Sequence, residues 1–206
     1  LLSPVSYQES VNQLQDFEPK KISVILPCLN ECKNLVAIIP DINSALENYN
    51  HEIVVVDDNS NDGTLQALKA LNNPSVKVIS RAKNPGLALS IKEGIKKSNG
   101  DAIVIMDSDY NHKPSQLPIL ISNLQYFDCV VASRFVYGGS MHTELRLRLS
   151  WLFNVGIRLM TKTYITDSLF GFLSIKRSII NDLNLENIFW GFGDYNIRLM
   201  FYLQKK

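Results

Sequence analysis

Short apolar runs rich in β-branched residues recur along the first two thirds of the chain, and helical periodicity follows most of them. They lie within residues 22–26, 51–58, 76–80, 102–106 and 129–133. Apolar runs of this length are typical of strands that are buried on both faces of a sheet. After the first run, Leu35, Ile38 and Ile42 recur at three- and four-residue steps, which predicts a helix with one apolar face. This alternation predicts an α/β fold, with a mostly parallel sheet covered by helices on both faces.

The length and composition are those of one globular domain. The chain has 206 residues, of which 46% are hydrophobic and 20% are charged, and this apolar content excludes disorder as the main state. We expect an N-terminal arm over residues 1–20 and one domain over residues 21–206. A formal net charge of +1 argues against a nucleic-acid-binding protein, which would show a basic excess. Three cysteines, an odd number, predict free thiols in a reducing cytosol.

Acidic side chains follow the second and fourth predicted strands. Asp57 and Asp58 end the second strand, and Asp107-Ser108-Asp109 follows the fourth. Ligands of open α/β sheets bind at the carboxyl ends of the strands, so we expect these carboxylates at one edge. Two carboxylates that repel each other favour a bound cation, and their oxygens suit Mg²⁺ or Mn²⁺. Asn111 adds a candidate carbonyl ligand, while the neighbouring His112 is expected at the surface or in a loop.

The same edge has the features of a nucleotide site without a glycine-rich phosphate loop. A carboxylate at the end of the second strand, here Asp58, typically accepts hydrogen bonds from a nucleotide's ribose or base. Pro27, Leu29 and Glu31 follow the first strand, where the base would lie. Neither G-x-G-x-x-G after that strand nor G-x-x-x-x-G-K-[ST] anywhere occurs in the sequence, so metal and arginine would hold the phosphates.

Five motifs, in this order along the chain, resemble glycosyltransferase family 2, and more narrowly its dolichyl- or polyprenyl-phosphate mannosyltransferase branch. They are residues 27–31 (PCLNE), residues 56–64 (VDDNSNDGT), Arg81 with Gly86, Ala88, Ser90 and Gly94, residues 106–109 (MDSD) and residues 133–135 (SRF). The resemblance covers about residues 21–180. It implies a GT-A, Rossmann-like fold, a nucleotide-sugar donor of the GDP-mannose or UDP-glucose type, a divalent metal and inverting transfer. The chain departs from the branch at Leu29, where an aromatic residue is common, and at Phe170, where a small polar residue stands.

Carried over position by position, the resemblance implies a role for each motif residue. The nucleotide would be bound by Pro27, Leu29, Glu31, Val56, Asp58, Arg81, Asp107 and Ser108. Asp107, Asp109 and Asn111 would hold the metal. Arg134 would meet the donor diphosphate and, with the metal, neutralise the charge that develops on the leaving group. Arg146 and Ser150 would meet the acceptor phosphate, which divides the domain into a nucleotide-binding half at about residues 21–135 and an acceptor half at about 136–206.

The sequence leaves two classes of acceptor open. A polyprenyl or dolichyl phosphate is already an anion and needs only positive groups, which Arg146 and Arg148 can supply together with Ser150. A carbohydrate hydroxyl needs a general base, for which Asp194 is the best candidate, although Asp194 has the simpler role of favouring the start of a helix. Two other functions are a sugar-phosphate nucleotidyltransferase, which would want a glycine- and arginine-rich loop after the first strand, and an inactive nucleotide-sugar-binding module.

Residues 144–163 predict a long helix in which arginines alternate with large apolar residues such as Trp151 and Phe153. We interpret it as an amphipathic helix that packs its apolar stripe on the core and turns its arginines toward the site. The alternative is a helix that lies in a membrane interface. No run of about 18 apolar residues is present. We therefore expect a cytoplasmic protein at the cytosolic face of a membrane, with peripheral contact only.

Overall fold

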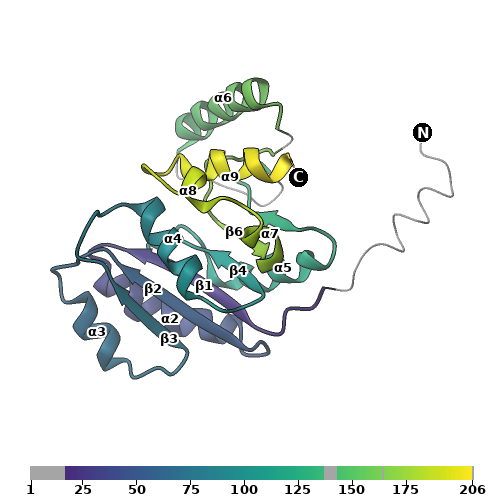
Figure 1. Ribbon diagram of the computed structural model, residues 1–206. Coiled ribbons are helices and arrows are strands. Elements are labelled where there is room, and N and C mark those ends of the chain that lie inside the picture. Colours follow the sequence, from purple (N-terminus) through teal and green to yellow (C-terminus); the bar gives the residue numbers. More distant parts are fainter. Residues whose placement is uncertain (1–16, 137–142, 164, 206) are drawn as a thin grey trace.

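The computed structural model describes residues 17–136, 143–163 and 165–205, so most of the predicted N-terminal arm lies outside the described residues. Figure 1 shows the arrangement of the elements. In chain order they are β1 Ile22–Cys28, α2 Cys32–Ala45, β2 His51–Asp57, α3 Thr64–Ala70, β3 Val76–Ser80, α4 Leu87–Lys97, β4 Ala102–Ile105, the 3-10 helix η1 Pro114–Gln116, α5 Leu117–Ser122, the 3-10 helix η2 Asn123–Gln125, β5 Cys129–Val131, α6 Glu144–Thr161, β6 Leu173–Lys176, α7 Arg177–Asn181, α8 Leu185–Ile188 and α9 Tyr195–Gln204.

The strands form one six-stranded sheet in the order β3-β2-β1-β4-β6-β5. The pairs β1–β2, β2–β3 and β1–β4 are parallel, whereas β6 is antiparallel to both β4 and β5. The mostly parallel sheet that the sequence predicts is therefore confirmed, with one antiparallel strand inserted. Because β6 runs against both of its neighbours, β4 and β5 end at the same edge. This topology brings the loop after β4 and the loop after β5 to one side of the molecule.

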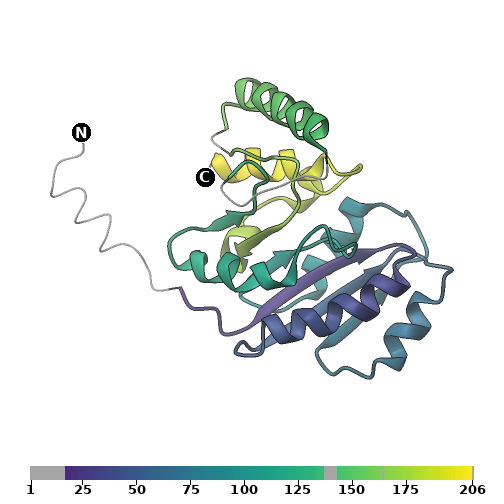
Figure 2. The same cartoon turned by 180° about the vertical axis from the view of Figure 1, so that it is seen from behind.

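Helices cover both faces of the sheet, and the pleat of the strands divides the core between them. Val24 and Leu26 of β1 pack with buried residues of α2 and α5, while Ile25 between them packs with α4 on the other face. Figure 2 shows α2 and α3 on the first face, and Figure 1 shows α4, α7, α8 and α9 on the second. Buried apolar residues on both sides explain why the strands read as nearly continuous apolar runs in the sequence.

The first strand continues past Pro27, where the sequence pattern ends it. Pro27 pairs with Val56 and Cys28 with Asp57 in the parallel ladder of β1 and β2. The fifth strand is shorter than its apolar run. It ends at Val131, so Ser133 and Arg134 lie in the following loop. Both differences matter for the site, since they fix where the chain leaves the sheet edge.

Helix α6 is amphipathic as predicted, but it does not pack its apolar stripe on the core. Leu145, Leu149, Leu152 and Leu159 recur at three- to four-residue steps around Gly156, and all four leucines are exposed, Leu152 to 61% and Leu159 to 76%. The opposite side of the helix, which includes Ser150 and Asn154, faces the protein because these side chains bond to the loops around residues 134 and 168. Figure 1 shows α6 beyond α9, away from the sheet. In the described part of the chain no helix is both long and apolar enough to cross a membrane.

Candidate active site

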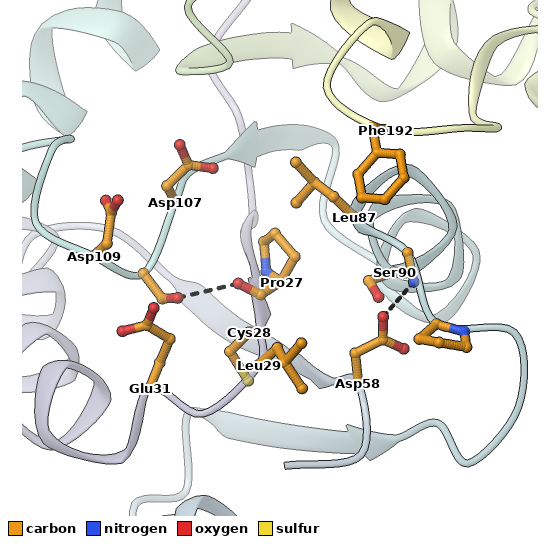
Figure 3. A pocket seen from close by; sticks show the side chains of 13 residues that line it. Pro27, Cys28, Leu29, Glu31, Asp58, Leu87, Ser90, Asp107, Asp109 and Phe192 are labelled. Carbon is orange, nitrogen blue, oxygen red and sulfur yellow. Dashed lines mark hydrogen bonds between the residues drawn. The ribbon is translucent and has the colours of Figure 1, made fainter.

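A cavity of about 460 Å³ lies at the carboxyl ends of β1, β2 and β4 (Figure 3). Its walls come from the loops that follow these strands, from the start of α4 and from the loop before α9. The lining residues are Pro27, Cys28, Leu29, Glu31, Asp58, Pro85, Gly86, Leu87, Ser90, Asp107, Ser108, Asp109 and Phe192. Six of the eight residues that the resemblance assigns to the nucleotide therefore line one cavity: Pro27, Leu29, Glu31, Asp58, Asp107 and Ser108.

The other two residues of that set, Val56 and Arg81, do not line the cavity. Val56 is fully buried in β2. Arg81 donates from Nη1 to the Asp58 carboxylate at 2.7 Å and to the Ser90 hydroxyl at 2.6 Å. The second oxygen of Asp58 accepts the backbone N–H of Gly86. Arg81 thus neutralises a buried carboxylate and ties the end of β2 to the start of α4, as a buried charge requires.

The two carboxylates after β4 face the cavity together (Figure 3). Burial, reinforced by the negative charge of Asp109, raises the pKa of Asp107 to about 6. The Asn111 side-chain amide donates to one oxygen of Asp109 at 2.6 Å, and its backbone N–H donates to the other at 3.0 Å. Ser108 turns inward and donates to the Pro27 carbonyl at 3.1 Å. The loop therefore presents Asp107 and Asp109 to the cavity while Ser108 fastens it to β1.

This pair of carboxylates fits a hard divalent cation. Two carboxylates that destabilise each other's charge gain most from a cation, and their oxygens are the ligands that Mg²⁺ and Mn²⁺ prefer. Among the described residues, no group of three or more histidine, cysteine or acidic side chains is arranged to hold a metal by itself. A metal at Asp107 and Asp109 would therefore complete its coordination with water and substrate oxygens, as Mg²⁺ commonly does at phosphate sites.

A second cavity of about 630 Å³ adjoins the same loop. It is lined by Asp107, Tyr110, Asn111, His112, Lys113, Arg134, Arg146, Leu169, Phe170 and Gly171. Asp107 lines both cavities, so the two share one carboxylate at their junction. The cations of this cavity, Lys113, Arg134 and Arg146, make it suited to an anionic ligand.

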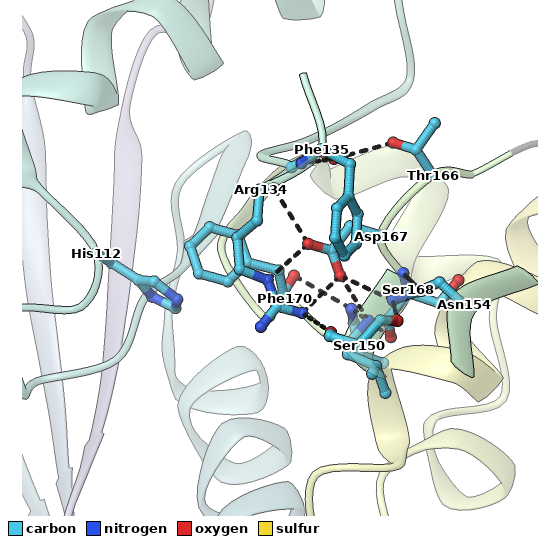
Figure 4. A network of polar contacts seen from close by, with 12 residues as sticks. His112, Arg134, Phe135, Ser150, Asn154, Thr166, Asp167, Ser168 and Phe170 are labelled. Carbon is cyan, nitrogen blue, oxygen red and sulfur yellow. Dashed lines mark hydrogen bonds and ion pairs between the residues drawn. The ribbon is translucent and has the colours of Figure 1, made fainter. Parts of the chain in front are cut away.

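Arg134 is held in this cavity by a network of buried polar groups (Figure 4). Its Nε and Nη2 atoms donate to the two oxygens of Asp167 at 2.8 and 2.9 Å, and Nη2 also donates to the Ser150 hydroxyl at 3.1 Å. Asp167 is fully buried, and Asn154 donates to its carboxylate at 3.5 Å. The structure therefore brings Arg134, Arg146 and Ser150 together, whereas Arg134 does not line the first cavity.

Asp194, the candidate general base, lines neither cavity. Its carboxylate is ion-paired with Arg198 one helical turn later and accepts the backbone N–H of Phe192 at 3.1 Å. The hydrogen bond from Arg198 holds the pKa of Asp194 below its ordinary value, which makes the carboxylate a weaker base. Arg198 also stacks on Trp190, with its guanidinium carbon 3.9 Å from the ring centre. Asp194 therefore ties the loop before α9 to the first turn of that helix, and its role as a general base stays a prediction.

His112 lies in a loop, as predicted, but it is buried, at 1% exposed, rather than at the surface. Its ring stacks on Phe172 at 4.8 Å between centres and meets Phe170 edge to face at 4.6 Å. Burial lowers the pKa of His112 to about 4, so the imidazole is neutral at pH 7. Only its position next to the acidic motif could have marked it, because both aromatic partners come from a distant part of the chain.

Comparisons with known proteins identify relatives of this chain. The family model described as "Glycosyl transferase family 2" matches residues 23–183. The chain is 36% identical over 174 residues to a dolichol-phosphate mannosyltransferase of Pyrococcus furiosus, covering 82% of this chain and 49% of that protein. It is 30% identical over 175 residues to an undecaprenyl-phosphate mannosyltransferase of Micrococcus luteus, covering 82% of this chain and 71% of that one. The chain thus spans about half of the Pyrococcus protein.

Solved structures support the same fold. Glucosyl-3-phosphoglycerate synthase from Mycobacterium tuberculosis, in complex with Mn²⁺, uridine diphosphate and phosphoglyceric acid, superimposes with a TM-score of 0.63 at 22% identity. That match covers 80% of this chain and 58% of the synthase. The same synthase with Mg²⁺ and uridine diphosphate gives a TM-score of 0.61 at 20% identity, covering 89% of this chain and 63% of that one.

Proposed function

The chain belongs to glycosyltransferase family 2, and we propose that it transfers a sugar from a nucleotide-sugar donor to a polyprenyl or dolichyl phosphate. The observation that carries this proposal is the position of Asp107, which lines both an acidic cavity and a basic one. Transfer requires that donor and acceptor meet at one point, and the junction of the two cavities supplies it. The names of the two mannosyltransferase relatives support the same class of acceptor.

The first cavity suits the nucleotide of the donor. Pro27, Leu29 and Glu31 would lie along the base and ribose, and Asp58 would accept a hydrogen bond from them with its charge already balanced by Arg81. GDP-mannose and UDP-glucose are the donors to be tested first. Leu29 is 53% exposed in this wall, so it offers a free apolar surface to a base.

Asp107 and Asp109 would hold a divalent cation against the donor diphosphate, and Asn111 would be a third ligand once its amide turns from Asp109. A bound Mg²⁺ or Mn²⁺ would supply charge neutralisation for the leaving nucleoside diphosphate. The chain's own contribution is to place both carboxylates in the lining of one cavity.

The second cavity suits the acceptor phosphate. Arg134 and Arg146 would hold the anion, and the bond from Arg134 to Ser150 supports a fixed direction for the guanidinium. A phosphate monoester is an anion at neutral pH, so it can attack the sugar carbon without a general base. Attack from the face opposite the leaving group would invert the configuration of that carbon, with an oxocarbenium-like transition state.

The exposed apolar side of α6 supports a membrane surface as the place where the lipid acceptor is met. Leu149, Leu152 and Phe153 are each more than half exposed, and Arg146 lies on the same helix. Apolar side chains flanked by arginines are typical of helices that lie in the interface of anionic membranes. Arg146 also lines the second cavity. A lipid phosphate would therefore enter this cavity directly from the membrane surface that α6 contacts.

A transfer assay tests the proposal. The chain is incubated with radiolabelled GDP-mannose or UDP-glucose, Mn²⁺ and a short-chain polyprenyl phosphate in detergent, and the lipid phase is counted. Label in the lipid phase, lost in Arg146→Ala and unchanged in a distant variant such as Lys69→Ala, is the expected result. Label that appears only when a carbohydrate replaces the lipid would contradict the phosphate acceptor.

A further inference from the structure

The backbone leaves the sheet at the residue that both cavities share. The Met106 N–H still donates to the Ile25 carbonyl of β1 at 3.1 Å, but the N–H of Asp107 has no strand partner and donates instead to Nδ1 of His112 at 2.8 Å. A buried backbone N–H needs an acceptor, and here a side chain five residues later in the same loop supplies it. His112 therefore closes the loop that carries both carboxylates.

The same imidazole also faces the side chain of Asp107. Because Nδ1 accepts a hydrogen bond, the proton of the neutral ring is on Nε2. Nε2 lies 3.6 Å from Oδ2 of Asp107, beyond the length of a direct hydrogen bond. One ring thus contacts both the backbone and the carboxyl group of a single residue.

The ring itself has little freedom to move. It is stacked on Phe172 and meets the edge of Phe170, and Phe170 in turn lies under the guanidinium of Arg134 at 5.3 Å (Figure 4). Phe170 is one of the two positions at which this chain departs from the branch that it resembles. The aromatic contact therefore links His112 with the basic side of the second cavity.

We propose that His112 is a positioning residue, which holds Asp107 in the orientation that binds the divalent cation through the bond from the Asp107 N–H to Nδ1. This inference rests on the proposed function. Groups that orient a metal ligand typically change metal affinity about 10- to 100-fold when they are removed. Because Phe170 and Phe172 hold the ring of His112 in place, the hydrogen bond to its Nδ1 atom also holds the backbone of Asp107 in place.

Two amide variants separate this role from simple packing. In His112→Asn the amide oxygen takes the place of Nδ1 and still accepts the Asp107 N–H. In His112→Gln the amide is one methylene further from the backbone and cannot take that place. The Mn²⁺ dissociation constant of each is measured from the electron paramagnetic resonance signal of free Mn²⁺, with saturating GDP or UDP, and melting temperatures are recorded without metal.

We expect the Asn variant to bind Mn²⁺ close to the wild-type value and the Gln variant to bind about 10- to 100-fold more weakly, with similar metal-free melting temperatures for the two. Equal affinity in both variants, whether retained or lost, would overturn the role of Nδ1. Wild-type protein that binds no Mn²⁺ with either nucleotide would instead overturn the proposed function, so the two failures are distinguishable.

Discussion

At the scale of single residues, two kinds of acidic side chain meet at the sheet edge. Asp58 and Asp167 are buried and each is bonded to an arginine, Arg81 and Arg134 respectively. Asp107 is different, because within the described residues its charged neighbours include no bonded lysine or arginine, and burial raises its pKa to about 6. The two arginine-bonded carboxylates also accept backbone N–H groups, from Gly86 and Arg134 respectively. Ionisation of Asp107 is unfavourable in the folded protein, and a bound cation would remove this penalty.

Asp107→Asn should stabilise the metal-free protein above pH 6. A carboxyl whose folded pKa lies near 6 instead of 3.8 binds more protons in the folded than in the unfolded state between those values, so the free energy of unfolding falls as pH rises through this window. The asparagine variant lacks this loss. Since 38% of the side chain is exposed, solvent screening limits the gain to about 1 kcal/mol at pH 7.5. Urea unfolding at pH 4 and pH 7.5 measures it.

The difference between the two proteins should be much smaller at pH 4, where Asp107 is largely protonated in the folded protein and about half protonated in the unfolded chain. The same variant should lose Mn²⁺ binding in the presence of a nucleoside diphosphate. A variant that is less stable than wild type at pH 7.5 without metal would show that the charge of Asp107 is not strained in the folded protein.

Asp194→Asn should leave transfer to a lipid phosphate close to the wild-type rate. Asp194 is committed to Arg198 and lines neither cavity, and a phosphate acceptor needs no base. Losing one exposed ion pair of this spacing costs about 0.3–0.5 kcal/mol of stability. The kcat of the labelled-sugar assay is the measurement, with donor affinity as its control. A large loss of kcat with unchanged donor affinity would favour a hydroxyl acceptor with Asp194 as base.

At the scale of elements, packing between α4 and the sheet leaves no room at Gly94. A Cβ atom there would lie 2.5 Å from Cγ2 of Ile25 and 3.2 Å from Cγ2 of Val56, whereas a Cβ at Gly156 of α6 meets nothing within 4 Å. Gly94→Ala should therefore destabilise the protein by about 1–3 kcal/mol through overpacking. Gly156→Ala, its matched control, should stabilise it by up to about 1 kcal/mol through helix propensity. Urea unfolding of both variants checks the pair, and equal effects would contradict the close approach of α4.

The exposed leucines of α6 should matter for membrane binding. Leu152→Gln removes an apolar side chain that is 61% exposed, and Ile119→Gln in α5 removes one that is 63% exposed, so the two variants are closely matched. Burying a leucine in the interface contributes on the order of 1.5 kcal/mol, so Leu152→Gln should weaken binding to anionic vesicles about tenfold. Vesicle flotation measures the bound fraction. Equal losses in the two variants would show that α6 is not the surface that meets the membrane.

The elements also show where prediction from sequence ends. The strands β1, β2 and β4 were predictable because they are buried on both sides and read as apolar runs, as in Ile53–Val56. The orientation of α6 was not, because an amphipathic pattern does not say which face meets the protein. Its polar face is turned inward by Asp167, which lies outside the helix and binds Arg134. The insertion of β6 depends likewise on pairing between strands far apart in the chain.

At the scale of the whole molecule, one sheet edge joins an acidic and a basic cavity. The motif residues after β1, β2 and β4 were found from the sequence because parallel strands bring their carboxyl ends together. The second cavity was only partly foreseen: Arg134 and Arg146 line it and Ser150 bonds to Arg134, but the contacts of His112, Asp167 and Phe170 depend on the tertiary structure. Six cavity residues thus followed from the family resemblance of the motifs, while the side chains that support them required the tertiary structure.

The most direct test of the account is a thermal-shift panel of nucleoside diphosphates and their sugars, each with and without Mn²⁺. A ligand that binds only the folded protein raises the melting temperature with its occupancy. We predict a rise with GDP-mannose or UDP-glucose that requires Mn²⁺ and disappears in Asp109→Ala. A rise that is the same without metal, or that persists in Asp109→Ala, would contradict the claim that this carboxylate edge holds the donor through a cation.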